Sequence, residues 1–452
     1  MVMQKIDISF KRIQQLALPA IVAGIAEPIL SSTDAAVVGN ISEFGTESLA
    51  AVGIVGSFLS TIIWVLAQTR SAISAIISQN LGAGNLKSLR FFPAQAILFN
   101  VLLSFILLFS TYFFIEEIFI FLKADGKILT YSKDYYYIRI WGFPLTLFTF
   151  AIFGIFRGLQ NTFWPMIIAS FGAIINIVLD IILVYGVNNF VDPMGVKGAA
   201  WASLIAQLIM AILSLSLLLY KTNVSLRLKR ALHPELKRLV TMSFNLFIRS
   251  IALNIALLLA VREATSLGKE YIAAHTIAIN LWLFSAFFID GYGAAGNILG
   301  GRLLGAKMYQ ELWTLTKRVN IYNLIVSLLL VSIGVLFYNH LGLIFTKDTL
   351  VLTTFYSIFF IVLISQPFNA LGFTLDAIFK GLGEMKYLRN ILVAATFFGF
   401  IPTLLIGNYL DLKLKGIWVA LVVWIAFRAI ALIYKFKVKY YPLAKSELVN
   451  HK

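Results

Sequence analysis

The sequence predicts an all-α polytopic membrane protein with twelve transmembrane helices in two pseudo-symmetric six-helix lobes. Three observations support this fold class. The chain is 60% hydrophobic and only 13% charged over 452 residues, with a mean hydropathy of +0.88, and soluble globular proteins do not need so much apolar surface. Apolar runs of about 20 residues or more recur along the chain, and each can cross a hydrocarbon layer about 30 Å thick as a helix. The two halves of the chain also resemble each other in one register.

The expected helices follow from the hydropathy in chain order. The apolar runs are continuous, whereas barrel strands would alternate polar and apolar residues over about ten positions. The first run is too long, and too clearly the first of a series, to be a cleaved signal peptide. A basic loop at 221–238 separates the first six runs from the second six. The expected spans are 14–39, 49–78, 91–115, 135–158, 163–187, 196–220, 238–265, 271–300, 316–339, 350–379, 387–409 and 414–435.

The positive charge is unevenly distributed between the loops. With a cytoplasmic N-terminus, Lys and Arg on the cytoplasmic side outnumber those on the opposite side by about three to one, which predicts that both termini are cytoplasmic. We therefore interpret the net charge of +16 as the result of basic residues that orient the protein in the membrane and contact anionic lipids, and not as a sign of nucleic-acid binding. The absence of cysteine excludes disulfides and thiol chemistry. The expected location is the bacterial cytoplasmic (inner) membrane.

The two halves align as an internal duplication. Residues 47–85 match 270–308 without gaps at a shift of 223 positions, and the same shift pairs Gly158 with Gly381. Six helices per half give both halves the same orientation, and a substrate path usually lies between such parallel repeats. The predicted domains are an N-terminal lobe at 1–220, a cytoplasmic linker at 221–237, and a C-terminal lobe at 238–452 that ends in a short basic tail.

Acidic residues within the first expected span point to function, because a charge at the bilayer centre costs about 2.5 to 3.5 kcal/mol. Asp34 lies well inside this span, and Glu27 lies seven residues earlier on nearly the same helix face. Pro19 and Pro28 each remove a backbone hydrogen bond, so this helix has a potential hinge. We expect a titratable acid on a bendable helix; the alternative is a static acid paired with an arginine.

Asp180 and Asn176 lie one turn apart on the fifth expected span. An Asn amide has both a donor and an acceptor, so it can bridge two carboxylates in either protonation state. Two neighbouring carboxylates cannot both be ionised at low cost, which favours a proton-binding site. A purely structural polar cluster is the alternative.

The second half has its own intramembrane acids, Glu263, Asp290 and Asp376. Neither Asp290 nor Asp376 has an acidic partner at the shift of 223, so the acids do not follow the duplication. Asp376 lies four residues before Lys380, and an internal ion pair between them is the alternative to a functional role. We interpret His275 as a packing residue. The intramembrane arginines are interpreted as counter-ions, namely Arg70, Arg139, Arg249, Arg262 and Arg428.

Several segments, taken together, resemble the multidrug and toxic compound extrusion (MATE) family, in the branch of DNA-damage-inducible protein F. They are STDAAVVGNI at 32–41, NIVLD at 176–180, GVKGAAWASL at 195–204 and QPFNALGFTLDAIFKGLG at 366–383. The resemblance implies two lobes that rock between outward and inward openings while protons or sodium ions enter and cationic drugs leave.

The resemblance also implies roles for individual residues. Asp34, Asn176 and Asp180 match the polar network of the first lobe, and Ser203 stands where many members have threonine. Pro19 matches a proline associated with bending of the first helix. Asp290 and Asp376 match acids typical of the second lobe, but Lys380 departs from the pattern and makes sodium coordination there doubtful.

These observations predict a secondary active multidrug efflux transporter that exports amphipathic organic cations in antiport with protons or sodium. The 38 Phe, 18 Tyr and 8 Trp suit such substrates through apolar burial and cation–π attraction. No cofactor is expected, and the coupling ion is a proton or a sodium ion bound at Asp34 and Asp180. We expect a monomer surrounded by membrane lipids.

Other functions stay open. A flippase of lipid-linked intermediates is the main alternative, and it would favour a cationic cavity. An enzyme is not expected, because no HExxH, GxSxG or phosphate-loop pattern occurs. A purely structural membrane protein would not need so many buried acids.

Overall fold

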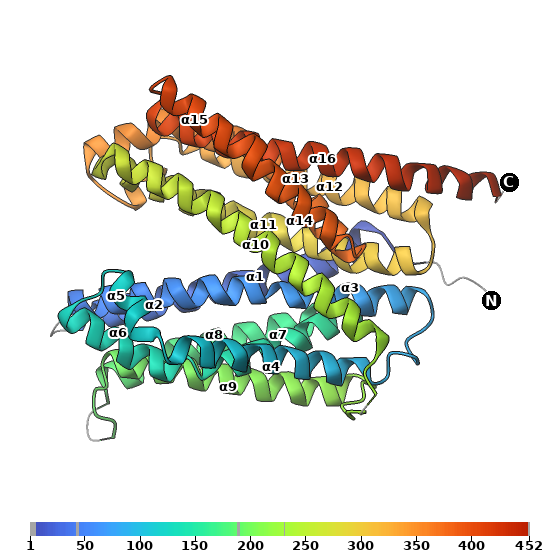
Figure 1. The fold of residues 1–452 in the computed structure, drawn as a ribbon, viewed down its shortest axis with the longest axis horizontal. Helices are drawn as coiled ribbons and strands as arrows, with labels where there is room; N and C mark the ends of the chain where they lie inside the picture. The colour runs from blue at the N-terminus through green and yellow to red at the C-terminus, as the bar shows by residue number, and fades with distance from the viewer. Residues whose placement is uncertain (1–5, 42–44, 188–189, 230, 451–452) are drawn as a thin grey trace. The chain divides into compact units, whose positions relative to one another are not determined.

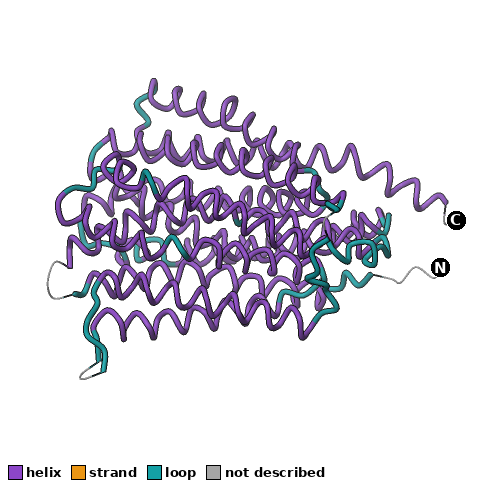
Figure 2. The backbone as a smooth tube through the Cα atoms, turned by 60° about the horizontal axis from the view of Figure 1, so that its bottom comes forward, coloured by secondary structure: helices purple, strands orange, loops and turns teal. Residues whose placement is uncertain are grey.

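A computed structural model describes residues 6–41, 45–187, 190–229 and 231–450; within α1 the side chains at 27, 28 and 30–32 lie outside the description. Helix is nearly the only regular structure in these ranges (Figure 2), apart from one isolated bridge between Val187 and Val191. The chain divides into two compact units. Unit 1 comprises residues up to Ile21, Ser78–Gly84 and the chain from Thr241 onward, and unit 2 comprises Val22–Ile77 and Asn85–Val240.

The first half of the chain forms nine helices among the described residues (Figure 1). The first and third of them contribute residues to both units. The helices are α1 (Phe10–Gly39), α2 (Gly45–Leu66), α3 (Gln68–Gly82), α4 (Phe92–Tyr112), α5 (Ile115–Phe121), α6 (Gly126–Arg139), α7 (Gly142–Gly158), α8 (Phe163–Tyr185) and α9 (Val196–Lys221).

The second half lies in unit 1 from Thr241 onward. Its apolar core gathers buried side chains of α10, α11, α13 and α16, among them Trp282, Phe355, Trp418 and Trp424. The elements are α10 (Pro234–Leu267), α11 (Lys269–Gly305), α12 (Tyr309–Leu336), η1 (Leu341–Ile344), α13 (Thr349–Gly381), α14 (Met385–Ala394), η2 (Ala395–Phe400), α15 (Ile401–Tyr409) and α16 (Lys413–Asn450).

The prediction of a twelve-helix membrane protein is confirmed. Ten described helical segments are long and apolar enough to cross a membrane, and α6 with α7, bent by 46° at their junction, gives an eleventh if the pair is counted as one span. The 30-residue α1 is about 45 Å long at 1.5 Å per residue, which is ample for the twelfth. The boundaries of the two predicted lobes stay a prediction.

Close helix contacts at glycines repeat at the shift found in the sequence. A Cβ added to Gly158 would lie 3.1 Å from the Ser74 carbonyl oxygen, and one added to Gly381 would lie 2.2 Å from that of Asn297. Ser74 and Asn297 are themselves 223 positions apart, so the same crossing occurs once in each half. The duplication therefore preserved backbone contacts that only a residue without a side chain permits.

A second glycine contact joins the two halves reciprocally within unit 1. An added Cβ at Gly82 would lie 1.9 Å from the Arg302 carbonyl oxygen, and one at Gly305 would lie 1.8 Å from that of Gln79. Gln79 and Arg302 are again 223 positions apart. Gly82 of the first half therefore meets Arg302 of the second, and Gly305 of the second half meets Gln79 of the first. Such a reciprocal pair of contacts is typical of two-fold symmetry.

Candidate functional site

The Asp34 carboxyl group is the centre of a buried polar cluster in unit 2. Its side chain is only 3% exposed, and its Oδ2 accepts hydrogen bonds of 2.9 Å from both the Ser203 and the Tyr135 hydroxyls. These donors come from α9 and α6, so helices distant in sequence meet at one carboxylate. Buried charges are tolerated in proteins where such donors surround them.

Small residues bring α8 and α9 close enough to extend this cluster. A Cβ added to Gly198 would lie 2.4 Å from the Leu183 carbonyl oxygen, so the two backbones pass in direct contact. At this separation Asn176 on α8 donates from Nδ2 to the Ser203 hydroxyl at 3.2 Å. The result is a chain of hydrogen bonds from Asn176 through Ser203 to Asp34. All three residues were predicted from the sequence, and the structure brings them together.

Tyr135 is the member of the cluster that the sequence analysis missed. Its hydroxyl donates to Asp34 and accepts from the Arg139 Nε at 3.3 Å. Arg139 is one turn after Tyr135 on α6, and its charge acts on Asp34 and Asp180. Arg139 is therefore a counter-ion of Asp34 that acts through the Tyr135 hydroxyl and not by direct contact. The available signal was the DYYYIR segment, in which a tyrosine and an arginine share one helix face.

Asp180 completes the cluster. It is fully buried, and the charges of Asp34 and Arg139 act on it. Two ionised carboxylates have no proton to donate to each other. Accordingly, neither Asp180 oxygen has a donor among the described side chains, and the same holds for Asp34 Oδ1 and Asn176 Oδ1.

Four buried acceptor oxygens without a donor define what this site can do. Leaving such groups unpaired costs free energy, about 1 to 3 kcal/mol for a neutral group and more for a charged one. A proton on one carboxyl would supply a donor, and a bound cation would interact with several of these oxygens at once. The site therefore suits a ligand that is itself a proton or a cation.

The remaining predicted residues of the first lobe lie on α1. The helix is continuous through Pro19, and the boundary between the two units falls two residues later, between Ile21 and Val22. The side chains of Glu27 and Pro28 lie outside the described residues. The bending of α1 at these prolines stays a prediction.

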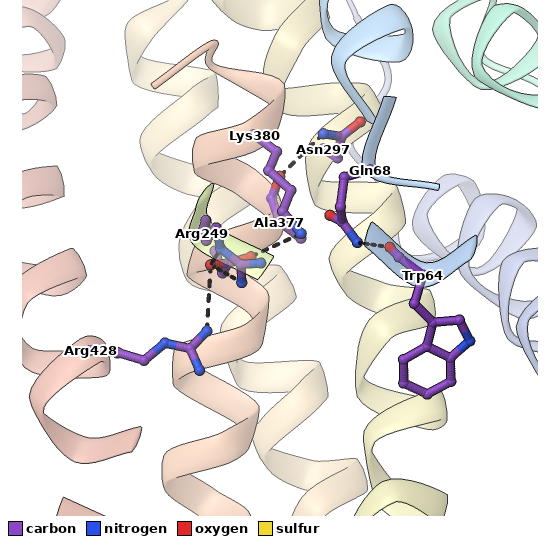
Figure 3. A network of polar contacts seen from close by, with 8 residues as sticks. Trp64, Gln68, Arg249, Asn297, Ala377, Lys380 and Arg428 are labelled. Atoms are coloured by element: carbon purple, nitrogen blue, oxygen red, sulfur yellow. Dashed lines mark hydrogen bonds and ion pairs between the residues drawn. The ribbon is translucent and has the colours of Figure 1, made fainter. Parts of the chain in front are cut away.

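Asp376 in unit 1 lies among three basic side chains, those of Arg249, Lys380 and Arg428, which Figure 3 labels. Its Oδ1 accepts from Arg249 Nη2 at 2.6 Å and from Nε at 3.0 Å, while its Oδ2 lies 3.0 Å from Lys380 Nζ. Arg428 Nη2 lies 3.5 Å from Oδ1, and its guanidinium also stacks over the Phe373 and Trp424 rings. The ion pair to Lys380 considered from the sequence is present, and Arg249 and Arg428 are counter-ions as interpreted.

The structure does not join the three predicted acids of the second lobe into one site. Glu263 accepts a hydrogen bond from Asn408 at 2.7 Å, and it is 14 residues, or about 21 Å along the helix axis, from Arg249 on α10. Asp290 is exposed, and its charge acts on Lys380 and Arg428. Glu263 is therefore far along α10 from Arg249, the residue of this helix that binds Asp376, and the functional roles of these acids stay a prediction.

Other predicted residues fall outside both clusters. The Arg70 guanidinium lies over the Phe150 ring at 5.3 Å, and Arg262 is exposed. His275 is buried and its ring lies 5.7 Å from that of Trp418, as expected of a packing residue.

Comparison with known proteins finds relatives that match nearly the whole chain. The MatE family model matches residues 19–182 and 246–405. The chain is 27% identical to DNA damage-inducible protein F of Escherichia coli K12 over 436 residues, covering 94% of this chain and 91% of that protein. It is 24% identical to the probable multidrug resistance protein NorM of Thermotoga maritima, covering 93% and 90%. A crystal structure described as MATE in the bent conformation superposes with a TM-score of 0.89 at 21% identity, covering 96% of both chains.

Proposed function

The chain belongs to the MatE family, and from this premise we propose that it exports amphipathic organic cations in exchange for protons. It is a multi-pass membrane protein by its helices. The observation that carries the proposal is the cluster of Asp34, Asn176 and Asp180, whose four buried oxygens lack a donor among the described side chains. The related protein of Thermotoga maritima is named a probable multidrug resistance protein, which agrees with an efflux role.

The exchange follows from competition for the same negative charge. An organic cation is attracted to the ionised carboxylates of Asp34 and Asp180, whereas a proton neutralises one of them and weakens that attraction. Proton entry from outside therefore favours cation release outside. A sodium ion would compete in the same way, so sodium is the alternative coupling ion.

Alternating access couples this competition to movement. We place the conformational change in α1, where Pro19 precedes the boundary between the two units by two residues and lacks a backbone donor. The description of a similar structure as bent supports the idea that this fold has more than one conformation. Protonation of Asp34, which lies on the same helix, then changes the relative stability of the two conformations.

The proposal is tested with purified protein in liposomes that contain ethidium. A pH gradient should drive ethidium exchange in the natural protein, and Asp34→Asn should abolish it, because the amide keeps the shape but cannot ionise. Glu263→Gln is the matched control: it removes another intramembrane acid, one that binds Asn408, and should retain exchange. Wild-type exchange in Asp34→Asn would refute the proposal, and exchange that follows only a sodium gradient would identify sodium as the coupling ion.

A flippase of lipid-linked intermediates is the second candidate, and one observation favours it. Arg249, Lys380 and Arg428 carry three positive charges around the single carboxylate of Asp376, which suits an anionic phosphate better than a cation. Ethidium uptake into everted vesicles, where the cytoplasmic face is outward, separates the two functions. Uptake that responds to neither a proton nor a sodium gradient would favour the flippase.

A further inference from the structure

The last helix of unit 1 is too long for the membrane alone. The 38 residues of α16 span about 57 Å at 1.5 Å per residue, whereas a hydrocarbon core is about 30 Å thick. Its last turns therefore lie outside the hydrocarbon. In this part Phe436, Tyr440 and Ala444 are buried on one face, while Lys437 and Lys445 are exposed.

This extension lies beside the start of α12 (Figure 1) and contacts it. The Trp313 ring stacks on Phe436 with centroids 5.5 Å apart and also contacts Tyr441 at 5.1 Å. The Glu447 carboxylate accepts from the backbone N–H groups of Tyr309 and Gln310 at 2.7 and 2.9 Å. An anion at a helix N-terminus is stabilised by the unpaired N–H groups and the helix dipole. The negative charge of Glu447 is thus already paired with the N-terminus of α12.

A groove of about 410 Å³ lies between these two helix segments. Its walls carry three basic side chains, Lys317, Arg318 and Lys445, and its other lining side chains include Trp313, Tyr441 and Leu448. None of its lining residues is acidic. The nearest acids in sequence are Glu311, which does not line the groove, and Glu447, which caps α12. The groove is therefore electropositive.

Several contacts hold the groove in shape. Arg318 Nη1 donates to the Ile8 carbonyl oxygen at 2.9 Å, and Lys317 Nζ lies 5.4 Å from the Trp313 ring centroid. A preformed site loses less conformational entropy on binding than one assembled from free side chains. Lys317 and Lys445 stay exposed, so their ammonium groups are accessible to a ligand.

The position of the groove selects a membrane lipid over a soluble anion. It lies at the first turns of α12, and the long apolar run of this helix begins just beyond, at Val319. Leu448 and Tyr441 beside the basic groups are 49% and 47% exposed, and a soluble phosphate cannot cover this apolar surface. Basic pockets between helices with aromatic neighbours at the membrane boundary are typical sites for anionic headgroups.

We propose that this groove binds the headgroup of an anionic phospholipid, with its phosphate between Lys317, Arg318 and Lys445 and its glycerol and upper acyl region against Tyr441 and Leu448. The lipid joins the extension of α16 to α12 at the membrane surface. This role is independent of the transported substrate.

The experiment is native mass spectrometry of the full chain released from micelles that contain equal amounts of phosphatidylglycerol and phosphatidylcholine. The natural protein should retain phosphatidylglycerol preferentially. The double variant Lys317→Gln/Lys445→Gln should retain about 25-fold less of it, since each basic residue near an anionic surface contributes about fivefold in affinity. The matched control, Lys386→Gln/Lys437→Gln, changes the net charge equally at exposed lysines outside the groove and should bind like the natural protein.

Two outcomes would overturn the proposal. Equal loss in the groove variant and the control would show that only the net charge matters. Displacement of the lipid by millimolar inorganic phosphate would identify a site for a free anion. Hydrogen exchange gives a second measurement: exchange at 436–449 should be slower in phosphatidylglycerol than in phosphatidylcholine for the natural protein, and this difference should disappear in the groove variant.

Discussion

The Tyr135 hydroxyl is the only described side chain that joins Asp34 to a basic group, because it donates to the carboxylate and accepts from Arg139. Tyr135→Phe removes both bonds and leaves the ring. A hydrogen bond to a charged group contributes about 1.5 to 3 kcal/mol, so cation exchange driven by a pH gradient should fall about tenfold or more. The measurement is initial ethidium efflux from liposomes.

Tyr136→Phe is the matched control for this variant. Tyr136 is the next residue on α6, and its hydroxyl donates to Thr111 at 2.5 Å, away from the acids. It should transport at nearly the natural rate. Equal losses in the two variants would point to damage to α6 and would contradict the role given to Tyr135.

Asp376 is expected to matter for stability. Asp376→Asn would leave Arg249, Lys380 and Arg428 without their shared carboxylate, and breaking a buried ion pair on one side costs about 3 to 5 kcal/mol. The thermal unfolding midpoint of the purified protein should fall clearly. Glu263→Gln, which alters one partly exposed hydrogen bond to Asn408, should lower it far less, and an unchanged midpoint in Asp376→Asn would show that the cluster is not stabilising.

At the residue level, the sequence predicted what helical periodicity controls. Asn176 and Asp180, and likewise Asp376 and Lys380, are four residues apart, so each pair necessarily shares a helix face. Tyr135 contacts Asp34 across 101 positions, and Arg249 contacts Asp376 across 127. Such contacts depend on how helices pack, and one sequence holds no record of which side chains meet.

The crossing of α3 and α11 is expected to tolerate no side chain at its glycines. In Gly82→Ala the new methyl would meet the Arg302 carbonyl oxygen at 1.9 Å, so the backbones must separate, and overpacking of this kind costs about 1 to 3 kcal/mol. The unfolding midpoint should fall. Gly53→Ala on α2 is the control, because nothing lies within 4 Å of its added Cβ, and its midpoint should not decrease.

At the level of elements, hydropathy predicted which segments are helices better than where they end. The apolar run of the last helix ends near residue 435, but α16 continues to Asn450, because backbone hydrogen bonds persist where the side chains become polar. The π-helix at Ala395–Phe400 was also not predicted. It ends two residues before Pro402, which lacks the N–H that would bond to the Phe398 carbonyl. A hydropathy profile does not show this missing hydrogen bond.

The whole molecule is organised by its duplication. The glycine contacts of Gly158 and Gly381 recur at the shift of 223, whereas the acids of the two halves do not. The repeat could be recognised from the sequence because close backbone contacts keep glycines in register. The net charge of the polar cluster in the second half could not be predicted from the sequence. Asp376 is acidic, but three basic side chains surround it, so the cluster as a whole is positively charged.

The twelve crossings and the bias of basic residues predict a definite topology. Both termini should be cytoplasmic, and the loop between α8 and α9 should be on the other side. The chain has no cysteine, so a single introduced cysteine can be labelled without background reaction at other sites. Ser446→Cys should react with an impermeant maleimide in everted vesicles only, and Asp192→Cys in right-side-out vesicles only. Labelling of both from the same side would contradict the predicted number of crossings between them.

The reciprocal contact of Gly82 and Gly305 makes the two positions energetically dependent. A methyl at either one pushes apart the same pair of backbones, those of α3 and α11. Once the first methyl has separated the two helices, the second methyl occupies space that this separation has already created. Gly82→Ala and Gly305→Ala combined should therefore destabilise the protein by less than the sum of their separate effects, a coupling of about 0.5 to 3 kcal/mol for residues in contact.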